Sequence, residues 1–109
     1  PDSNIPNELG MLPGAGSFVE MVAYATQQRP VYIGKPRSII MANALKRSGL
    51  RKDQVVMVGD NYRTDITAGL DFGIDTLLVY SGLSKRAEVE QEDRQPTFEI
   101  DSLDDWELI

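Results

Sequence analysis

The chain contains neither cysteine nor histidine among its 109 residues. Without cysteine it has no disulfide, no thiolate metal site and no cysteine nucleophile. Without histidine it lacks the commonest general base, and it cannot form a Ser-His-Asp triad. These two absences exclude whole classes of enzyme and of metal site.

Long apolar runs are also missing. No run approaches the roughly 18 consecutive apolar residues that indicate a membrane span, and no signal peptide is visible. We therefore expect a protein that has no membrane partner. The absence of cysteine is compatible with the cytosol, and we expect a cytoplasmic location.

Positive charge is scarce relative to negative charge. The chain has 11 Lys and Arg residues against 17 Asp and Glu residues, which gives a formal net charge of −6. This balance argues against a nucleic-acid polymer or an anionic membrane surface as a partner. The excess lies in the second half, since residues 1–54 carry +3 and residues 55–109 carry −9. A solvated acidic surface is the simplest explanation for that half.

What is present is the composition of one small globular domain. Hydrophobic residues make up 41% of the chain, and a chain this long buries roughly 60–70% of its unfolded surface. Apolar runs and helical periodicity predict strands and helices in alternation. The predicted strands are residues 31–33, 55–58, 76–80 and 97–100, and the predicted helices are residues 15–28, 36–48, 65–72, 84–90 and 102–107. Alternation of this kind predicts an α/β fold, with a Rossmann-like parallel sheet and flanking helices.

The first 14 residues do not fit this alternation. They hold three prolines and two glycines, which predict an extended, turn-rich opening segment. In the rest of the chain, right-handed crossovers place the helix N-termini at the carboxyl edge of the strands. Open α/β sheets bind their ligands along that edge. We expect the loops at 34–36, 59–65 and 81–84 to lie there.

Two aspartates stand at this predicted edge. Asp60 follows a buried strand, and Asp65 lies in the first turn of the next helix, for which Thr64 is the predicted N-cap. Two carboxylates can bind one hard divalent cation, and Mg²⁺ needs only one or two because it keeps several waters. The helix N-terminus offers N–H groups to an anion such as phosphate. A loop aspartate beside an aspartate at a helix start explains the pair equally well, so the residues alone leave both explanations open.

Lys35 is a further candidate in the expected edge loops. It lies between a strand end and a helix start, with Gly34 before it and Pro36 after it. A lysine there can neutralise a phosphate or a nearby carboxylate. Taken alone, a solvated surface lysine is the simpler interpretation. The glycines at 14 and 16 lack the preceding strand and the Lys-Ser/Thr pair of a phosphate loop, and we expect them only to start a helix.

Together these motifs resemble one family, the haloacid dehalogenase-like (HAD) hydrolases. GKP at 34–36, VVMVGDNYRTD at 55–65 and ITAGLDFGIDTLLVYSG at 66–82 are similar to the C-terminal part of the HAD core domain. They are most similar to the NagD-like branch, which includes p-nitrophenyl phosphatases and sugar or nucleotide phosphatases. Residues 1–14 resemble the return from cap to core. The resemblance implies one partial core domain over residues 1–109, in which residues 15–109 are the C-terminal half of the core.

The resemblance also implies a reaction and roles for four residues. The reaction is Mg²⁺-dependent hydrolysis of small phosphomonoesters, such as a sugar phosphate, a nucleotide or p-nitrophenyl phosphate, through an aspartyl-phosphate. Lys35 matches the lysine that holds the substrate phosphate and the charge of the nucleophile, and Asp60 matches the acidic Mg²⁺ ligand. Asp65 matches the second acidic residue, which supports the metal or the lysine. Asn61 lies in the same loop and is expected to contact the substrate or the surroundings of the metal.

The sequence departs from the family pattern at the nucleophile. It has no D-x-D followed by Gly-Thr, and the family's Ser/Thr phosphate-binding motif and cap domain are also absent. Because the chain also begins at Pro1, we expect a fragment that carries two of four catalytic motifs and is inactive alone. Without the first strands one sheet edge is bare, and we expect it to pair with another copy.

A non-catalytic α/β binding module, such as a receiver-like domain, is the alternative. A receiver needs a phosphoacceptor aspartate, an acidic pair and a downstream lysine. Here Lys35 precedes the acidic loop, and no third strand-end aspartate is evident. Stable labelling of an aspartate by acetyl phosphate would favour this alternative.

Overall fold

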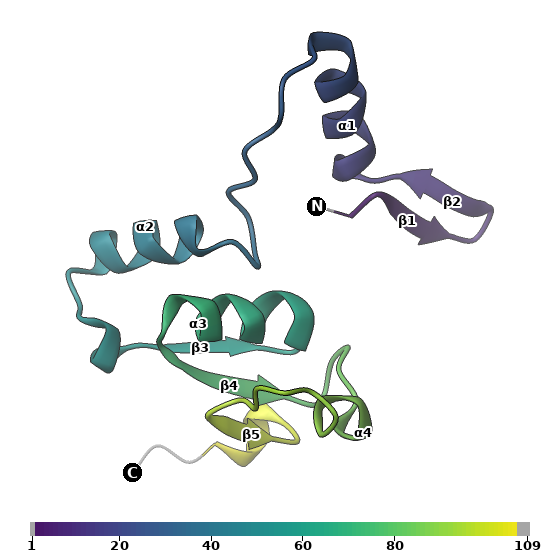
Figure 1. Cartoon of the computed structure of the whole chain (residues 1–109). Helices are drawn as coiled ribbons and strands as arrows, with labels where there is room; N and C mark the ends of the chain where they lie inside the picture. Colours follow the sequence, from purple (N-terminus) through teal and green to yellow (C-terminus); the bar gives the residue numbers. More distant parts are fainter. Residues whose placement is uncertain (1, 107–109) are drawn as a thin grey trace. The chain divides into compact units, whose positions relative to one another are not determined.

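The structure, a computed structural model, describes residues 2–106. The chain forms two compact units that divide after Gly34 (Figure 1). The first unit holds a β-hairpin and one helix, and the second holds a parallel sheet and the remaining helices. Among the helices of residues 2–106, none combines the length and the apolar character that crossing a membrane requires.

The first unit opens with a hairpin that the sequence did not predict. Strand β1 (Asn4–Asn7) pairs antiparallel with β2 (Gly10–Pro13), and all eight strand residues are exposed. The tight turn is stabilised by the side-chain oxygen of Asn7, which accepts a hydrogen bond from the Leu9 N–H at 2.6 Å. Gly10 has φ +130°, a conformation that favours glycine. Helix α1 (Ala15–Thr26) follows. It confirms the helix predicted at residues 15–28, although it ends two residues before the predicted end.

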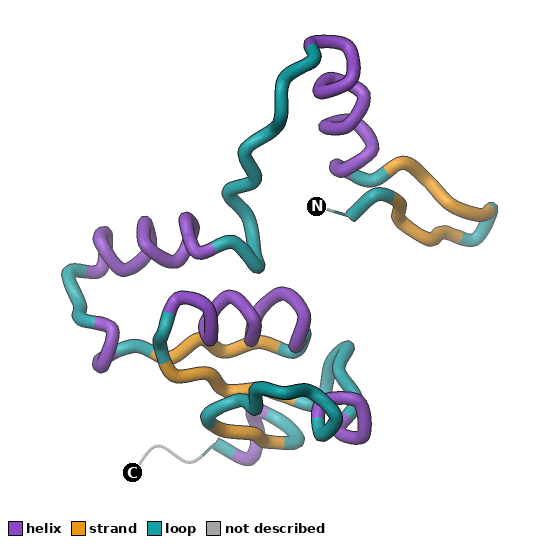
Figure 2. The backbone as a smooth tube through the Cα atoms, in the orientation of Figure 1, coloured by secondary structure: helices purple, strands orange, loops and turns teal. Residues whose placement is uncertain are grey.

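The strand predicted at residues 31–33 is wrong. Within the described chain these residues are loop, in the stretch between α1 and α2 (Figure 2). Val31 is 77% exposed and Ile33 is 54% exposed. A strand is stabilised by hydrogen bonds to a neighbouring strand, and no described strand pairs with this segment.

The second unit confirms the predicted α/β class. Its three strands, in the order β3-β4-β5, are all parallel, with Val58 opposite Leu77 and Leu77 opposite Phe98. The strands are β3 (Val56–Gly59), β4 (Asp75–Val79) and β5 (Phe98–Ile100). The helices are α2 (Ser38–Ser48), α3 (Thr67–Phe72) and α4 (Arg86–Val89), with a π-helical turn at Tyr62–Ile66 and 3₁₀ turns at Lys52–Gln54 and Leu103–Asp105.

One face of the sheet carries the core. Helix α3 packs on this face, and α2 packs against α3 (Figure 1). Ile66 and Leu78 are fully buried there, together with Val89 and Tyr62. Burying a Leu or Ile side chain contributes about 1.5–3 kcal/mol each. Helix α3 comes this close because residue 69 is glycine: a Cβ there would lie 2.5 Å from the Thr76 side chain.

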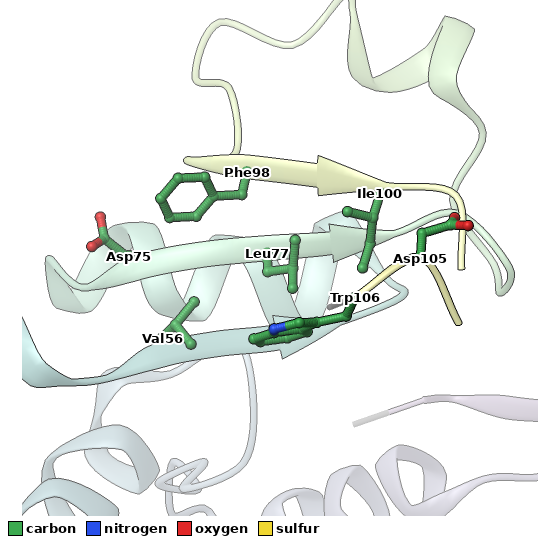
Figure 3. Close-up of a pocket in the computed structure, with 7 residues that line it drawn as sticks. All are labelled: Val56, Asp75, Leu77, Phe98, Ile100, Asp105 and Trp106. Carbon is green, nitrogen blue, oxygen red and sulfur yellow. The ribbon is translucent and has the colours of Figure 1, made fainter. Parts of the chain in front are cut away.

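The opposite face of the sheet is apolar and largely open. Figure 3 shows side chains from all three strands beside the indole of Trp106: Val56, Leu77, Phe98 and Ile100. Phe98 is 55% exposed and Trp106 is 44% exposed. The helix predicted at 102–107 is a shorter 3₁₀ turn, which Ser102 caps by accepting from the Asp104 N–H at 3.2 Å. This turn sets Trp106 against the sheet, while residue 107 lies outside the described residues.

A polar cluster ties α4 to the end of β5. The Arg86 guanidinium lies 4.2 Å from the centre of the Tyr80 ring and donates to Glu99 at 2.9 Å and to Asp101 at 2.8 Å. The Tyr80 hydroxyl donates to the same Glu99 carboxylate at 3.1 Å. Burial, then the hydrogen bond to Glu99, raises the pKa of Tyr80 to about 12.

We predict a loss of stability in alkaline solution that depends on Tyr80. Because the pKa in the folded state lies above the ordinary value of 10, the contribution is complete below pH 10. It is lost as the pH rises through 12. Thermal melts of the chain and of Tyr80→Phe, taken from pH 8 to 12, should differ below pH 10 and converge at the top of that range. A constant difference across the range would contradict this assignment.

Candidate functional site

The candidate residues meet at the carboxyl ends of β3 and β4. Strand β3 ends at Gly59, and the loop that follows carries Asp60 and Asn61 into the π-helical turn. Strand β4 ends at Val79 and is followed by the loop Ser81–Ser84. Because the two strands are parallel, both loops lie at one edge of the sheet.

Lys35 and Asp65 form an ion pair at this edge. The Lys35 ammonium donates to Asp65 Oδ1 although the two residues are 30 positions apart. The Asp65 side chain is only 7% exposed, whereas that of Lys35 is 45% exposed. Asp65 Oδ2 accepts from the Asn61 N–H at 3.3 Å. The buried Asp65 carboxylate thus holds the ammonium of a lysine whose side chain remains partly exposed to solvent.

Asp60 is fixed by the second loop. Its side-chain Oδ2 accepts from the Leu83 N–H at 3.1 Å, and its carbonyl accepts from the Ser84 N–H at 3.0 Å. The Ser84 hydroxyl in turn accepts from the Tyr62 N–H at 2.8 Å. Sequence reasoning placed the loop at this edge but gave it no role. The only local signal was the small residues that follow the buried strand.

The helix start predicted at Thr64 is wrong, because Asn61 takes the capping role. The Asn61 side-chain oxygen accepts from the Arg63 N–H at 3.0 Å, and the helical turn begins at Tyr62. Asparagine is among the best N-cap residues, so the earlier residue starts the turn. The predicted contact of Asn61 with a substrate remains a prediction.

Tyr62 lies beside these residues and is 9% exposed. Its hydroxyl donates to the Arg94 carbonyl at 2.6 Å. Burial, followed by the negative charge of Glu92, raises the pKa of Tyr62. The phenol is therefore held neutral and acts as a support for the turn that carries Asp65.

Gly59 leaves the space that Asp65 occupies. A Cβ at residue 59 would lie 2.2 Å from Asp65 Cβ and 2.5 Å from its Oδ2. Both of those contacts fall inside van der Waals distance, and Asp65 is buried. The Lys35–Asp65 pair therefore depends on glycine at the end of β3.

We predict that Gly59→Ala displaces Asp65 and destabilises the chain by about 1–3 kcal/mol, the range for overpacking a filled site. Urea unfolding measures the change. Gly34→Ala is the matched control, since a Cβ at Gly34 meets nothing within 4 Å. Equal stability of the two variants would contradict the steric role of Gly59.

The donor set fits Mg²⁺ as part of a larger site. Within residues 2–106, no three acidic side chains gather as a group that could hold a metal ion. The two Asp65 oxygens are engaged by Lys35 and the Asn61 N–H. The Asp60 side chain packs closely against Gly82, since a Cβ at residue 82 would lie 2.0 Å from Asp60 Oδ2. Mg²⁺ accepts one or two carboxylates and retains water, so Asp60 suits it better than Asp65.

The chain is similar in sequence to known proteins. A sequence model described as HAD-hydrolase-like matches residues 32–106. The 5'-nucleotidase YutF of Bacillus subtilis is 48% identical over 105 residues, which are 96% of this chain and 41% of that protein. An acid sugar phosphatase of Staphylococcus epidermidis is 43% identical over 103 residues, 94% of this chain and 40% of that protein.

Solved structures agree with the sequence relatives. A double mutant of a thermostable NPPase from Geobacillus stearothermophilus superposes with a TM-score of 0.80 at 44% identity, over 97% of this chain and 41% of that one. NagD from Escherichia coli K-12 gives a TM-score of 0.84 at 30% identity, over 99% of this chain and 42% of that one. The chain thus spans about two fifths of the length of these relatives. It belongs to the HAD-like hydrolases, among relatives of the NagD and p-nitrophenyl phosphatase type.

Proposed function

We propose that this chain supplies part of the active site of a Mg²⁺-dependent phosphatase that hydrolyses small phosphomonoesters. The observation that carries the proposal is the Lys35–Asp65 ion pair beside Asp60, at the carboxyl edge of the parallel sheet. Its relatives carry the names 5'-nucleotidase, acid sugar phosphatase and p-nitrophenyl phosphatase. A sugar phosphate, a nucleotide or p-nitrophenyl phosphate is the substrate class that we propose.

The four candidate residues have distinct parts in this proposal. The Lys35 ammonium neutralises charge on the phosphoryl oxygens and on the carboxylate that attacks phosphorus, and Asp65 orients Lys35. Asp60 holds the metal, with Asp65 supporting its surroundings, and Asn61 shapes the loop that the substrate approaches. Mg²⁺, when bound, withdraws charge from the phosphoryl oxygens.

The nucleophile is proposed to come from outside these 109 residues. No D-x-D followed by Gly-Thr occurs in the sequence, and the chain spans about two fifths of its relatives. An aspartate in the remaining part would attack phosphorus and release the alcohol, and water would then cleave the aspartyl-phosphate. The cap that selects the substrate would lie in the same part. Residues 1–109 would then form one partial core domain, with 1–14 as its return segment.

Location and self-association are parts of the same proposal. We propose a cytoplasmic protein whose partner is a small phosphorylated metabolite. Strand β3 is hydrogen-bonded to β4 on one side and lies at the edge of the three-stranded sheet. A bare edge of this kind pairs readily with another strand, and a second copy of the chain is the partner that we propose when the chain is isolated.

The test compares the chain alone with a chimera. In the chimera, this chain replaces the matching 41% of the Bacillus subtilis relative, which provides the rest of the active site. We expect no hydrolysis of p-nitrophenyl phosphate by the 109-residue chain and Mg²⁺-dependent hydrolysis by the chimera. Turnover by the chain alone, or a folded chimera without activity, would count against the proposal.

A further inference from the structure

The loop Ser81–Ser84 is attached to the residues around Asp60 by three hydrogen bonds. Leu83 N–H donates to Asp60 Oδ2 at 3.1 Å, and Ser84 N–H donates to the Asp60 carbonyl at 3.0 Å. Tyr62 N–H donates to the Ser84 hydroxyl at 2.8 Å. The loop therefore holds both the main chain and the side chain of Asp60, although the two segments are more than 20 residues apart.

Gly82 is the residue that allows this approach. A Cβ there would lie 2.0 Å from Asp60 Oδ2, 2.3 Å from its Cβ and 2.5 Å from its Cγ. Rotation about the Cβ–Cγ bond of Asp60 would relieve only the contact with Oδ2. The Cβ of Asp60 is fixed to the main chain, which the Ser84 N–H holds in place. Any side chain at position 82 must displace Asp60 or open the loop.

We infer that Gly82, together with the Leu83 N–H, positions the Asp60 carboxylate for metal binding. This inference rests on the proposed function, in which Asp60 is the metal ligand. The Leu83 N–H fixes one oxygen of the carboxylate and so limits rotation of the side chain. A ligand that is already ordered loses less conformational entropy when the metal binds. Gly82 is thus a positioning residue that acts through Asp60.

The test measures Mg²⁺ binding to the chimera with the Bacillus subtilis relative, which provides the rest of the active site, and needs no turnover. Amide shifts in ¹⁵N–¹H NMR spectra are followed as Mg²⁺ is added to the chimera with the unchanged chain and to the chimera with Gly82→Ala. We expect the variant to bind about 10–100-fold more weakly, the range for residues that orient a metal ligand. Asp60→Asn gives the affinity that remains without the carboxylate. Gly34→Ala, where a Cβ meets open space, should bind like the unchanged chain.

The spectra also separate displacement from unfolding. In Gly82→Ala, changes in amide chemical shift without Mg²⁺ should be confined to residues 60–65 and 81–84. The chemical shift of the amide of the buried Leu78 should not change. If that variant does not fold, Ser84→Ala replaces it. Loss of the Ser84 hydroxyl frees the loop from Tyr62 and should weaken Mg²⁺ binding less than Gly82→Ala.

Failure of this inference is distinguishable from failure of the proposed function. Suppose that Asp60→Asn weakens Mg²⁺ binding while the folded Gly82 or Ser84 variant binds as the unchanged chain does. The positioning role is then overturned, and Asp60 remains a metal ligand. If Asp60→Asn binds Mg²⁺ as well as the unchanged chain, the metal role of Asp60 is overturned, and the positioning role with it.

Discussion

Replacing Lys35 with methionine should lower kcat/KM for p-nitrophenyl phosphate by about 10²–10³-fold in the chimera with the Bacillus subtilis relative, the range for removing one preorganised group that stabilises transition-state charge. Methionine keeps most of the length of the side chain and removes its charge. The substitution also leaves the buried Asp65 carboxylate without its cation. Steady-state kinetics with saturating Mg²⁺ measures the change.

A matched substitution separates this effect from a general loss of positive charge. Lys46 is an exposed lysine in the last turn of α2, and Lys46→Met should leave kcat/KM within a factor of two. Asp65→Asn should also reduce kcat, because it weakens the attachment of Lys35, and its loss should be smaller than that of Lys35→Met. Equal activity of the Lys35 and Lys46 variants would remove Lys35 from the proposed site.

Replacing Leu78 with alanine should destabilise the chain by about 2–5 kcal/mol, the range for Leu→Ala at a packed site. Leu78 is fully buried at the centre of the core that α3 and the π-helical turn cover. Ile66 beside it is also fully buried, so the cavity cannot easily close. Because a whole domain is stable by only about 5–15 kcal/mol, such a loss should be visible as a large drop in Tm.

The control for this substitution is Leu83→Ala. Leu83 is 72% exposed, and only its main-chain N–H contributes to the contacts described above. Its truncation should change the free energy of unfolding by less than about 0.5 kcal/mol. Urea unfolding of both variants gives the comparison. If Leu78→Ala lowers the free energy of unfolding no more than Leu83→Ala does, Leu78 does not belong to the hydrophobic core.

Much of the second unit was predictable because its signals are local. The apolar run before Gly59 predicts a strand buried by neighbours, and the glycine that ends it predicts where Asp60 reaches the sheet edge. Gly73, with φ +75°, ends helix α3 as its position in the sequence indicated. Alternating strands and helices were enough to predict parallel pairing, which the register of β3, β4 and β5 confirms.

The remaining features depend on contacts between distant residues. Residues 31–33 have the composition of a strand, but a strand needs a hydrogen-bonded neighbour, which local composition cannot indicate. Thr64 and Asn61 are both acceptable caps, and the choice follows from which side-chain oxygen reaches a free N–H. The role of Gly82 appears only when the end of β4 is placed beside the end of β3.

The open face of the sheet has a practical consequence. Trp106 is the only tryptophan of the chain, and it lies 44% exposed beside Val56 and Leu77 on that face (Figure 3). Its fluorescence therefore reports on one surface alone. Any polypeptide that covers the face would move the indole from water into an apolar contact and shift its emission to shorter wavelength. The chain carries an intrinsic optical probe for anything that covers this face, and no label has to be attached.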